Sequence, residues 1–262
     1  MNLSLSGKRA LVCGSTQGIG KAAAVELSKL GASITLIARN EEKLKETLRS
    51  LDTGPHQNHD YLAVDFNDIN QLKSKVTAYL QKNGPAQILI NNTGGPPAGK
   101  IEKAQEQEFI QAFNNHLLCN HVLMLAVVEG MKASKYGRII NVISTSVKIP
   151  LKGLGVSNTI RAAVANWSKT LANELAIHQI TVNNVLPGAT NTQRLQGIIE
   201  NKSKANAIAS NEVIQEMIAE IPAGRFAEPE EVAGAIAFLA SPAAAYITGI
   251  NLPVDGGRTG SL

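Results

Sequence analysis

One stretch decides the fold of this chain: Ala10-Leu11-Val12-Cys13-Gly14-Ser15-Thr16-Gln17-Gly18-Ile19-Gly20. Its first four residues are apolar and predict a buried strand, and apolar residues at helical spacing follow the last glycine. Glycines between a strand and a helix let the backbone approach a phosphate, whose charge the helix N-terminus stabilises. Residues 14–20 therefore predict a nucleotide-binding turn. The alternative is a tight strand-to-helix turn with no ligand.

Outward from this turn, short apolar runs alternate with longer amphipathic stretches. The expected strands are residues 10–13, 33–38, 88–90, 138–143 and 180–185, and the longer expected helices are residues 69–81, 105–131 and 156–177. Near-continuous apolar strands are typical of a parallel sheet that is covered on both faces. The alternation predicts an α/β fold with a doubly wound parallel sheet, the Rossmann fold, in a single domain over residues 1–262.

The composition excludes several classes of protein. The 262 residues are 44% hydrophobic, enough for one large core, and no apolar run comes near the roughly 20 residues that span a bilayer. Residues 1–9 lack the apolar segment of a secretory signal. Cys13 and Cys119 are too few for a disulfide framework or a thiolate metal site, so we expect reduced, buried thiols, no metal and a cytoplasmic location. A net charge of +4 without basic runs does not indicate nucleic-acid binding.

One segment, residues 189–221, breaks the alternation of strands and helices. Its polar middle, residues 200–204, is flanked by apolar residues at helical spacing. We expect a mobile helical substrate lid here rather than a second domain. The apolar residues of the segment include Leu195, Ile198, Ile199, Ile208, Met217 and Ile218. They indicate either an apolar substrate or ordinary packing within the segment.

Several further motifs, together with the Gly-x-x-x-Gly-x-Gly spacing of the turn, resemble the short-chain dehydrogenase/reductase family. The matching segments are Asn91-Asn92-Thr93-Gly94, Pro187-Gly188-Ala189-Thr190-Asn191-Thr192, residues 225–233 and residues 254–257. The resemblance covers nearly the whole chain. It implies that Asp65 contacts the adenine of a dinucleotide, that Asn92, Thr93 and Gly94 line the cofactor, and that Pro187, Gly188, Thr190 and Thr192 lie beside the nicotinamide. Taken singly, Asp65 also fits a loop cap and Gly188 a plain turn.

The residues after the second expected strand indicate which cofactor binds. Ala38 ends this strand about 20 residues after the glycine-rich turn, where an NAD-preferring site carries Asp or Glu for the ribose hydroxyls. No acid stands there to repel a 2′-phosphate. Arg39 offers a bidentate donor to that phosphate, and Ser15 a further hydroxyl. We therefore expect NADP(H), with a solvated Arg39 at the start of a helix as the alternative.

The resemblance also implies where the catalytic groups lie, and there the chain departs from the family. The family reduces a carbonyl with an Asn, a Ser and a Tyr-x-x-x-Lys pair, in which the tyrosine supplies the proton. An alignment through residues 161–164 and 169–176 puts Ser157 at the tyrosine position and Arg161 at the lysine position. Ser144, thirteen residues before Ser157, falls at the serine position, and His116 falls at the asparagine position.

These replacements change the chemistry that is available. A serine hydroxyl is shorter and a much weaker acid than a phenol, and Arg161 keeps its proton but can hold the ribose hydroxyls of the cofactor. An unperturbed histidine has a pKa of about 6.5, so His116 is the one candidate for a replacement acid, although a structural helix histidine that is hydrogen-bonded to the backbone is the favoured interpretation. A divergent branch of the family carries this Ser-Asn-x-x-Arg sequence in place of Tyr-x-x-x-Lys.

Three functions fit these observations. The first is an NADPH-dependent reductase that transfers hydride to a carbonyl, for example of a 3-oxoacyl thioester, because the pattern is most similar to acyl-carrier-protein reductases. The second is an enoyl-thioester reductase, whose hydride goes to carbon. The third is a catalytically silent NADPH-binding sensor or scaffold. We expect a small-molecule partner, apolar or an acyl thioester, and a homo-oligomer, by resemblance a tetramer. We expect no nucleic-acid or membrane partner.

Overall fold

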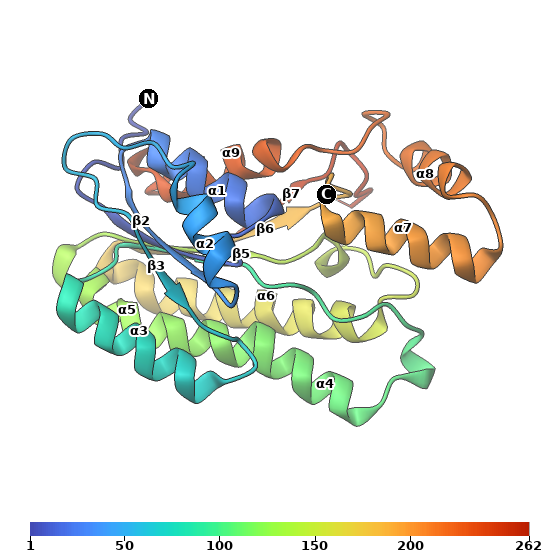
Figure 1. The fold of residues 1–262 in the computed structure, drawn as a ribbon, viewed down its shortest axis with the longest axis horizontal. Helices are drawn as coiled ribbons and strands as arrows, with labels where there is room; N and C mark the ends of the chain where they lie inside the picture. The colour runs from blue at the N-terminus through green and yellow to red at the C-terminus, as the bar shows by residue number, and fades with distance from the viewer. Residues whose placement is uncertain (262) are drawn as a thin grey trace.

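The computed structural model describes residues 1–261 and contains a seven-stranded parallel sheet in the order β3-β2-β1-β4-β5-β6-β7 (Figure 1). The strands are β1 Arg9–Cys13, β2 Ser33–Ala38, β3 Asp60–Ala63, β4 Ile88–Asn91, β5 Gly137–Val142, β6 Ile180–Pro187 and β7 Asn251–Val254. The chain starts at the centre, winds outward to β3, and then returns to build the other half. The predicted doubly wound sheet of a single Rossmann domain is confirmed.

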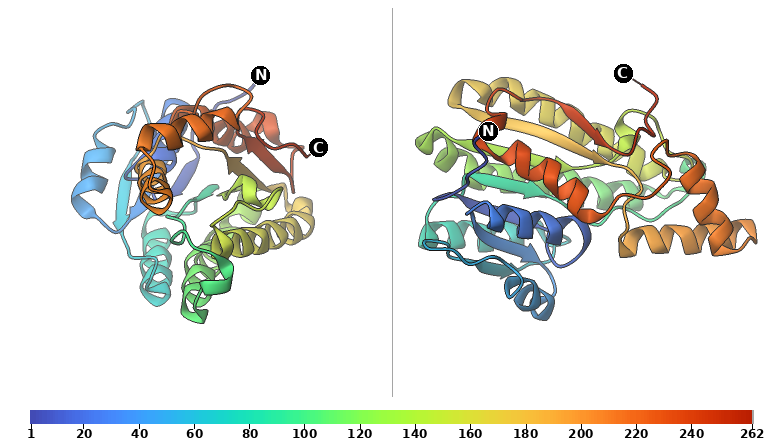
Figure 2. Two further views of the ribbon diagram at one scale, coloured as in Figure 1. Left: turned by 90° about the vertical axis from the view of Figure 1, so that its right-hand side faces the viewer. Right: turned by 90° about the horizontal axis from the view of Figure 1, so that it is seen from above.

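Helices cover both faces of this sheet (Figure 2). They are α1 Gly18–Lys29, α2 Glu41–Leu48, α3 Ile69–Asn83, α4 Glu106–Phe113, α5 Cys119–Ser134, α6 Gly155–Leu175, α7 Gln193–Asn206, α8 Ser210–Ala219 and α9 Pro229–Ala240. One core lies between the sheet and helices α1 and α9, and another between the sheet and helices α3, α5 and α6. The sheet is therefore a central layer between two layers of helices.

The central strands are buried on both faces, which explains their unbroken apolar sequences. In β1, Ala10 and Val12 face the core beneath α1 and α9, whereas Leu11 and Cys13 face the core beneath α3 and α5. All four residues have no exposed surface. Cys13 and Cys119 are free, buried thiols, and burial raises the pKa of each, to about 12 for Cys119. Both cysteines act as small core residues.

The sequence patterns missed β3 and β7 because these strands lie at the two edges of the sheet. Both strands are partly exposed along their whole length, so neither carries a continuous apolar run. Pro253 in β7 lacks the N–H that a central strand needs, but an edge strand tolerates proline. The expected helix over residues 105–131 is also interrupted, because a π-helical turn at Asn114–Leu118 separates α4 from α5.

Within the described part of the chain, one helical run, Glu106–Ser134, is long and apolar enough to span a membrane by length and composition alone. The uninterrupted apolar runs in the sequence are all much shorter than this helical run. The apolar residues of α5 include Leu123, Val127 and Met131, which are buried in the core beneath the sheet. Packing in that core accounts for only part of the hydropathy of this run, because less than half of it is buried and Ile110, Phe113 and Leu125 are exposed.

Helices α7 and α8 lie within the expected lid segment, residues 189–221, and project beyond the carboxyl ends of the strands (Figures 1 and 2). Their buried residues Leu195, Ile199, Val213 and Met217 pack together in a small cluster of their own, with Ile208 against it. This packing accounts for most of the apolar residues that the sequence left open to two interpretations. An apolar substrate is not needed to explain them.

Candidate active site and cofactor site

The glycine-rich turn between β1 and α1 has the backbone that its glycines predict. Gly14 and Gly18 have φ values of 59° and 52°, in the left-handed region that favours glycine. A Cβ atom at Gly14 would lie 2.5 Å from the carbonyl oxygen of Asn92, and one at Gly20 would meet the carbonyl of Gly14. No larger side chain fits at either position without a shift of the backbone.

Two other segments close around this turn. The side-chain amide of Asn92, after β4, donates hydrogen bonds of 3.3 Å to the carbonyl oxygens of Cys13 and Gly14. A Cβ at Gly18 would lie 2.9 Å from Cγ2 of Thr192, which caps the N-terminus of α7. The structure thus brings together the turn, Asn92 and Thr192, although they are separated by up to about 180 residues in sequence.

The turn also has unused polar groups of the kind that a phosphate would satisfy. Ser15 has no exposed surface, and its Oγ has no hydrogen-bond partner in the described structure. Gln17, the N-cap of α1, makes no side-chain hydrogen bond to the first backbone N–H groups of the helix. Buried polar atoms without partners are rare, and the free N–H groups of a helix N-terminus bind anions well. These residues fit the phosphate groups of a dinucleotide.

The other predicted cofactor residues follow the carboxyl ends of neighbouring strands. Arg39 comes directly after β2, is exposed, and has no ion pair within residues 1–261. Asp65 follows β3 and accepts a 3.0 Å hydrogen bond from the backbone N–H of Asn67. Thr93 and Gly94 follow β4, whereas Pro187 ends β6 and Gly188 and Thr190 come after it. Ligands of doubly wound sheets bind at this edge.

Ser157 and Arg161 lie one turn apart on the buried face of α6. Each side chain is only 7% exposed. The guanidinium of Arg161 donates one hydrogen bond, Nη1 to the carbonyl oxygen of Val142 at 3.3 Å, at the end of β5. Burial, and then the charge of Arg194, lower the pKa of Arg161 to about 10. The guanidinium is therefore charged at neutral pH, although it has no carboxylate partner in the described structure.

His116 lies in the π-helical turn and faces the loop after β4. Its Nδ1 is 2.5 Å from the hydroxyl oxygen of Thr93, and its side chain is 2% exposed. Burial, followed by the charges of Arg161 and Arg194, lowers its pKa to about 2. The imidazole is therefore neutral at physiological pH, which corrects the expectation that it titrates near neutrality as an acid.

Ser144 follows β5 and begins a short 3-10 helix, Thr145–Val147. Its Oγ accepts a 3.1 Å hydrogen bond from the backbone N–H of Ser146. Ser146 is 4% exposed, and its own Oγ has no partner in the described structure. The loop after β5 therefore places two serine hydroxyls near the site, although the sequence analysis identified only the first.

No tyrosine lies at the carboxyl ends of the central strands. Tyr61 donates a hydrogen bond to Glu41, and Tyr79 lies against Arg9 at the opposite end of β1. Tyr136 lies just before the start of β5 and donates a 2.7 Å hydrogen bond to the carbonyl of Ala240. Tyr246 is fully exposed. These are all four tyrosines of the chain. None of them is placed to supply a phenolic proton beside Arg161.

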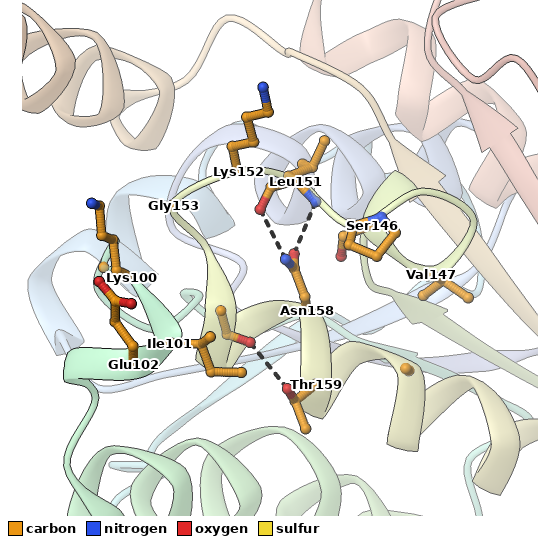
Figure 3. A pocket seen from close by; sticks show the side chains of 14 residues that line it. Lys100, Ile101, Glu102, Ser146, Val147, Leu151, Lys152, Gly153, Asn158 and Thr159 are labelled. Carbon is orange, nitrogen blue, oxygen red and sulfur yellow. Dashed lines mark hydrogen bonds between the residues drawn. The ribbon is translucent and has the colours of Figure 1, made fainter.

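A cavity of about 810 Å³ adjoins the other flank of α6 (Figure 3). Its lining residues are Gly99, Lys100, Ile101, Glu102, Ser146, Val147, Pro150, Leu151, Lys152, Gly153, Gly155, Asn158, Thr159 and Ala162. Asn158 bonds both backbone groups of Leu151: it donates at 2.8 Å to the carbonyl and accepts at 3.4 Å from the N–H. Asn158 thus fixes the loop that forms one wall of the cavity.

The cavity does not contain the predicted catalytic residues. Ser144, Ser157, Arg161 and His116 do not line it, but Ser146 and Asn158 belong to the same loop and helix as Ser144 and Ser157. The cavity is therefore next to the predicted site rather than at its centre. Its volume suits a small organic molecule.

Sequence reasoning missed three residues of this region: Ser146, Asn158 and Arg194. Ser146 and Asn158 stand beside predicted site residues in the sequence, but only the fold shows which way they face. Arg194 follows the predicted Thr192 by two residues and donates hydrogen bonds of 2.9 Å to the carbonyl oxygens of Gly95 and Pro96. Its place in the polar start of α7 gave no signal, because arginines are common on helix surfaces.

Comparison with known proteins agrees with this geometry. Residues 14–259 match a family model described as enoyl-(acyl carrier protein) reductase. The chain is 32% identical over 255 residues to the 3-oxoacyl-[acyl-carrier-protein] reductase FabG of Vibrio cholerae, covering 97% of this chain and 98% of that one. It is 30% identical over 259 residues to the NADPH-dependent reductase BacG of Bacillus subtilis, covering 98% of this chain and all of the relative.

A solved structure shares the whole fold. The L-sorbose reductase of Gluconobacter frateurii, complexed with NADPH and L-sorbose, superposes with a TM-score of 0.92 at 33% identity and full coverage of both chains. The extent of these matches, together with the glycine-rich turn and the strand order, shows that this chain belongs to the short-chain dehydrogenase/reductase family of NAD(P)H-dependent reductases.

Proposed function

We propose that this protein binds NADPH and transfers its hydride to the carbonyl carbon of an oxo compound, such as a 3-oxoacyl thioester. The observation that carries the proposal is the buried, charged guanidinium of Arg161, which has no carboxylate partner among residues 1–261 and lies at the end of β5 beside the cofactor site. A cation held away from bulk water stabilises the negative charge that develops on a carbonyl oxygen during reduction.

The cofactor would be held by residues from the carboxyl edge of the sheet. Residues 14–20 would bind the pyrophosphate, Arg39 and Ser15 the 2′-phosphate side, and Asp65 the adenine. Asn92, Thr93 and Gly94 would line the cofactor, and Pro187, Gly188, Thr190 and Thr192 would lie beside the nicotinamide. When bound, NADPH supplies the hydride. Three relatives that bind or use NADPH, the L-sorbose reductase, BacG and an actinorhodin polyketide ketoreductase, support this choice of cofactor.

The protein side chains would stabilise the substrate oxygen rather than protonate it strongly. Ser144 would donate a hydrogen bond to that oxygen, and Arg161 would supply positive charge. Neutral His116 can donate through Nε2–H if its Nδ1 accepts from Thr93, a tautomer that fits their 2.5 Å contact. Ser157 is too weak an acid to replace a phenol, so the last proton comes from water. We expect ketone reduction to be slower by about 10²–10⁴ than with a positioned acid.

The cavity beside α6 supports a substrate with a tail. Much of its wall is apolar, from Ile101, Val147, Leu151 and Ala162, and the unpartnered Ser146 hydroxyl marks the side toward Ser144. A substrate whose carbonyl lies at Ser144 could extend its remaining atoms into this space. An acyl chain suits such a wall, because burial of apolar surface favours binding.

A second candidate is reduction of an enoyl thioester. The specific observation in its favour is the placement of the four tyrosines: Tyr61, Tyr79 and Tyr136 form hydrogen bonds away from the site, and Tyr246 is fully exposed. In that reaction the hydride adds to the β-carbon and the electron pair moves to the thioester oxygen, where Arg161 would stabilise the enolate. The α-carbon then takes its proton from water, so no phenol is required. The description of the matching family model names this substrate class.

The test is NADPH consumption with a panel of oxo acids, 3-oxoacyl thioesters, simple keto esters and enoyl thioesters. We expect turnover of an oxo compound, and a fall of about tenfold or more in kcat/KM in Ser144→Ala, because the substrate oxygen loses a donor. The exposed Ser210→Ala is the matched control. If the protein binds NADPH but consumes it with none of these compounds, the proposal is wrong. The result would then favour the third function, a catalytically silent NADPH-binding sensor or scaffold.

A gain-of-function variant tests the placement of Ser157 and Arg161. The double change Ser157→Tyr with Arg161→Lys restores the acid and cation that the family uses, one turn apart on α6. We expect faster reduction of simple ketones at unchanged NADPH affinity. Rapid reduction of simple keto esters by the native enzyme, with no effect of Ser157→Ala, would show that a positioned acid elsewhere in the protein supplies the proton and that this placement is wrong.

A further inference from the structure

The loop after β5 carries two serine hydroxyls that are close together. The Oγ of Ser144 accepts a 3.1 Å hydrogen bond from the backbone N–H of Ser146. This bond uses Ser144 as an acceptor and leaves its O–H to donate to a substrate carbonyl, as the proposed function requires. Ser146, whose backbone makes this contact, also lines the cavity of about 810 Å³ beside α6. A second hydroxyl group is thus placed next to the one that would bind the reacting carbonyl.

The hydroxyl of Ser146 is buried and has no partner. The residue is 4% exposed, and its Oγ makes no hydrogen bond in the described structure. The other uncharged polar side chains of the cavity wall are engaged. Asn158 bonds the backbone of Leu151, and Thr159 donates at 3.1 Å to the carbonyl of Gly155 (Figure 3). Because buried polar atoms without partners are rare and costly, the Ser146 hydroxyl is the group of this wall that a ligand atom would satisfy.

The local turn does not depend on this hydroxyl. In the 3-10 turn Thr145–Val147, the N–H of Val147 donates to the carbonyl of Ser144 at 3.2 Å, and the N–H of Ser146 donates to the Ser144 side chain. Neither bond uses the Oγ of Ser146. Since no hydrogen bond fixes this hydroxyl, it can rotate between staggered positions about its Cα–Cβ bond and meet a ligand atom in the cavity.

We infer that Ser146 binds a second oxygen of the substrate, close to the carbonyl that is reduced. This inference rests on the proposed function and narrows its substrate to oxo compounds with a further oxygen one or two carbons from the reacting carbon. Ser144 would bind the carbonyl oxygen and Ser146 the second one. The thioester carbonyl of a 3-oxoacyl compound and the hydroxyl of a hydroxyketone both suit Ser146, because its hydroxyl donates and accepts. A simple ketone would leave Ser146 without a partner.

The test compares three ketones of similar size in NADPH oxidation. Ethyl 3-oxobutanoate and 1-hydroxyheptan-2-one carry the second oxygen, and heptan-2-one lacks it. We expect Ser146→Ala to lower kcat/KM about tenfold for the ester, the hydroxyketone or both, mainly by raising KM. The value for heptan-2-one should change by less than about twofold. Comparing the two proteins on each substrate cancels the intrinsic reactivity of the ketone. The substrate that is affected identifies which kind of oxygen Ser146 binds.

Further variants separate a role in specificity from a structural one. Ser146→Thr keeps a hydroxyl and should retain most of the preference. Ser74→Ala removes an exposed hydroxyl on α3 and should leave all three kcat/KM values unchanged. Ser146→Ala should not lower the Tm of the free protein, because the lost hydroxyl has no partner there. A lower Tm, an equal loss with all three ketones, or no loss with any of them overturns the inference.

Binding measurements distinguish failure of this inference from failure of the reductase proposal. Saturation-transfer NMR titrations with NADP⁺ present give the affinity of each ketone without turnover. If Ser146→Ala binds an oxygenated ketone about tenfold more weakly but the native protein consumes no NADPH, the second-oxygen site stands and the reductase proposal fails. If the native protein reduces these ketones and Ser146→Ala reduces and binds them equally well, the reductase proposal stands and the inference about Ser146 is wrong.

Discussion

At the scale of single residues, His116 shows most clearly how the fold changes the chemistry of a side chain. The sequence has a histidine at the position where the family has an asparagine. An ordinary histidine would be half protonated near neutral pH. Burial and two nearby arginines hold its pKa at about 2 instead. It is then a neutral hydrogen-bonding group, and its protonated form is not available as an acid at physiological pH.

This shift makes His116 a source of acid instability. Below its unfolded pKa of about 6.5, the unfolded chain binds a proton at this residue and the folded chain does not, so stability falls as the pH falls. Between pH 7 and pH 5 the native protein should lose about 2 kcal/mol more than His116→Asn. Urea unfolding at both pH values measures this difference. The exposed His178→Asn variant is the control and should lose as much stability as the native protein. If His116→Asn also loses as much stability as the native protein, the lowered pKa of His116 is contradicted.

Arg39 should determine the choice between the two nicotinamide cofactors. Arg39 is exposed, has no ion pair in the described part of the chain, and follows Ala38, where an acid would exclude a phosphate, so its charge is free for a 2′-phosphate. Arg39→Ala should cost about 1.5–3 kcal/mol of NADPH binding and leave NADH binding unchanged. Fluorescence titration of both cofactors measures this, with Arg49→Ala as the control. Equal affinities of the native protein for NADPH and NADH would refute the assignment.

At the scale of secondary-structure elements, an asparagine ladder joins four adjacent strands. Asn91, Asn141, Asn184 and Asn251 share one register across β4, β5, β6 and β7. Their side-chain amides are linked by hydrogen bonds of 2.7, 3.1 and 2.8 Å, and Asn141 also donates to the hydroxyl of Ser168 on α6 at 2.9 Å. The ladder links the carboxyl ends of β4 and β5 to β6 and to the start of β7.

Replacing the central member of this ladder should be strongly destabilising. Asn141→Leu leaves the amides of Asn91 and Asn184 and the Ser168 hydroxyl with fewer partners in a buried place, which should cost about 2–5 kcal/mol. The exposed Asn166→Leu on α6 should change stability by less than about 0.5 kcal/mol. Chemical denaturation of both variants gives the comparison. A loss below about 1 kcal/mol for Asn141→Leu would mean that the ladder contributes little.

How far the sequence predicts the structure depends on how local each signal is. The strands β1, β2, β4, β5 and β6 were found because burial on both faces forces unbroken apolar runs, whereas the partly exposed edge strands β3 and β7 carry no such pattern. The π-helical turn that contains His116 leaves the apolar spacing of α4 and α5 nearly intact, so this spacing predicts a single helix. The glycine-rich turn was readable because its strand, glycines and helix are contiguous in sequence.

The candidate site is harder to predict because its electrostatics come from distant segments. Arg161 belongs to α6, Arg194 to α7 and His116 to the turn before α5, and only the fold brings their charges close together. The pairing of Asn158 with Leu151 and the burial of the Ser146 hydroxyl likewise depend on how a loop folds back onto a helix. Motif spacing gives residue positions but not the direction in which side chains face.

At the scale of the whole molecule, the exposed face of α4 and α5 supports self-association. Ile110, Phe113 and Leu125 are 52%, 40% and 56% exposed along these two helices. Exposed apolar groups of this size on neighbouring helices are typical of a contact surface. We expect a homo-oligomer, and Ile110→Asp with Leu125→Asp should shift it toward the monomer. Sedimentation that finds only a 27.8 kDa species of the native protein at micromolar concentration would refute this expectation.

The central claim, hydride transfer to a carbonyl carbon assisted by Arg161, can be tested by following the hydride itself. The protein would be incubated with NADPH deuterated at the C4 position of its nicotinamide and a mixture of oxo acids, 3-oxoacyl thioesters and enoyl thioesters, and the products analysed by mass spectrometry and NMR. We predict deuterium on the carbon that bears the new hydroxyl, and a loss of most of this label in Arg161→Gln. Deuterium in a saturated acyl chain, or in no product at all, would contradict the account.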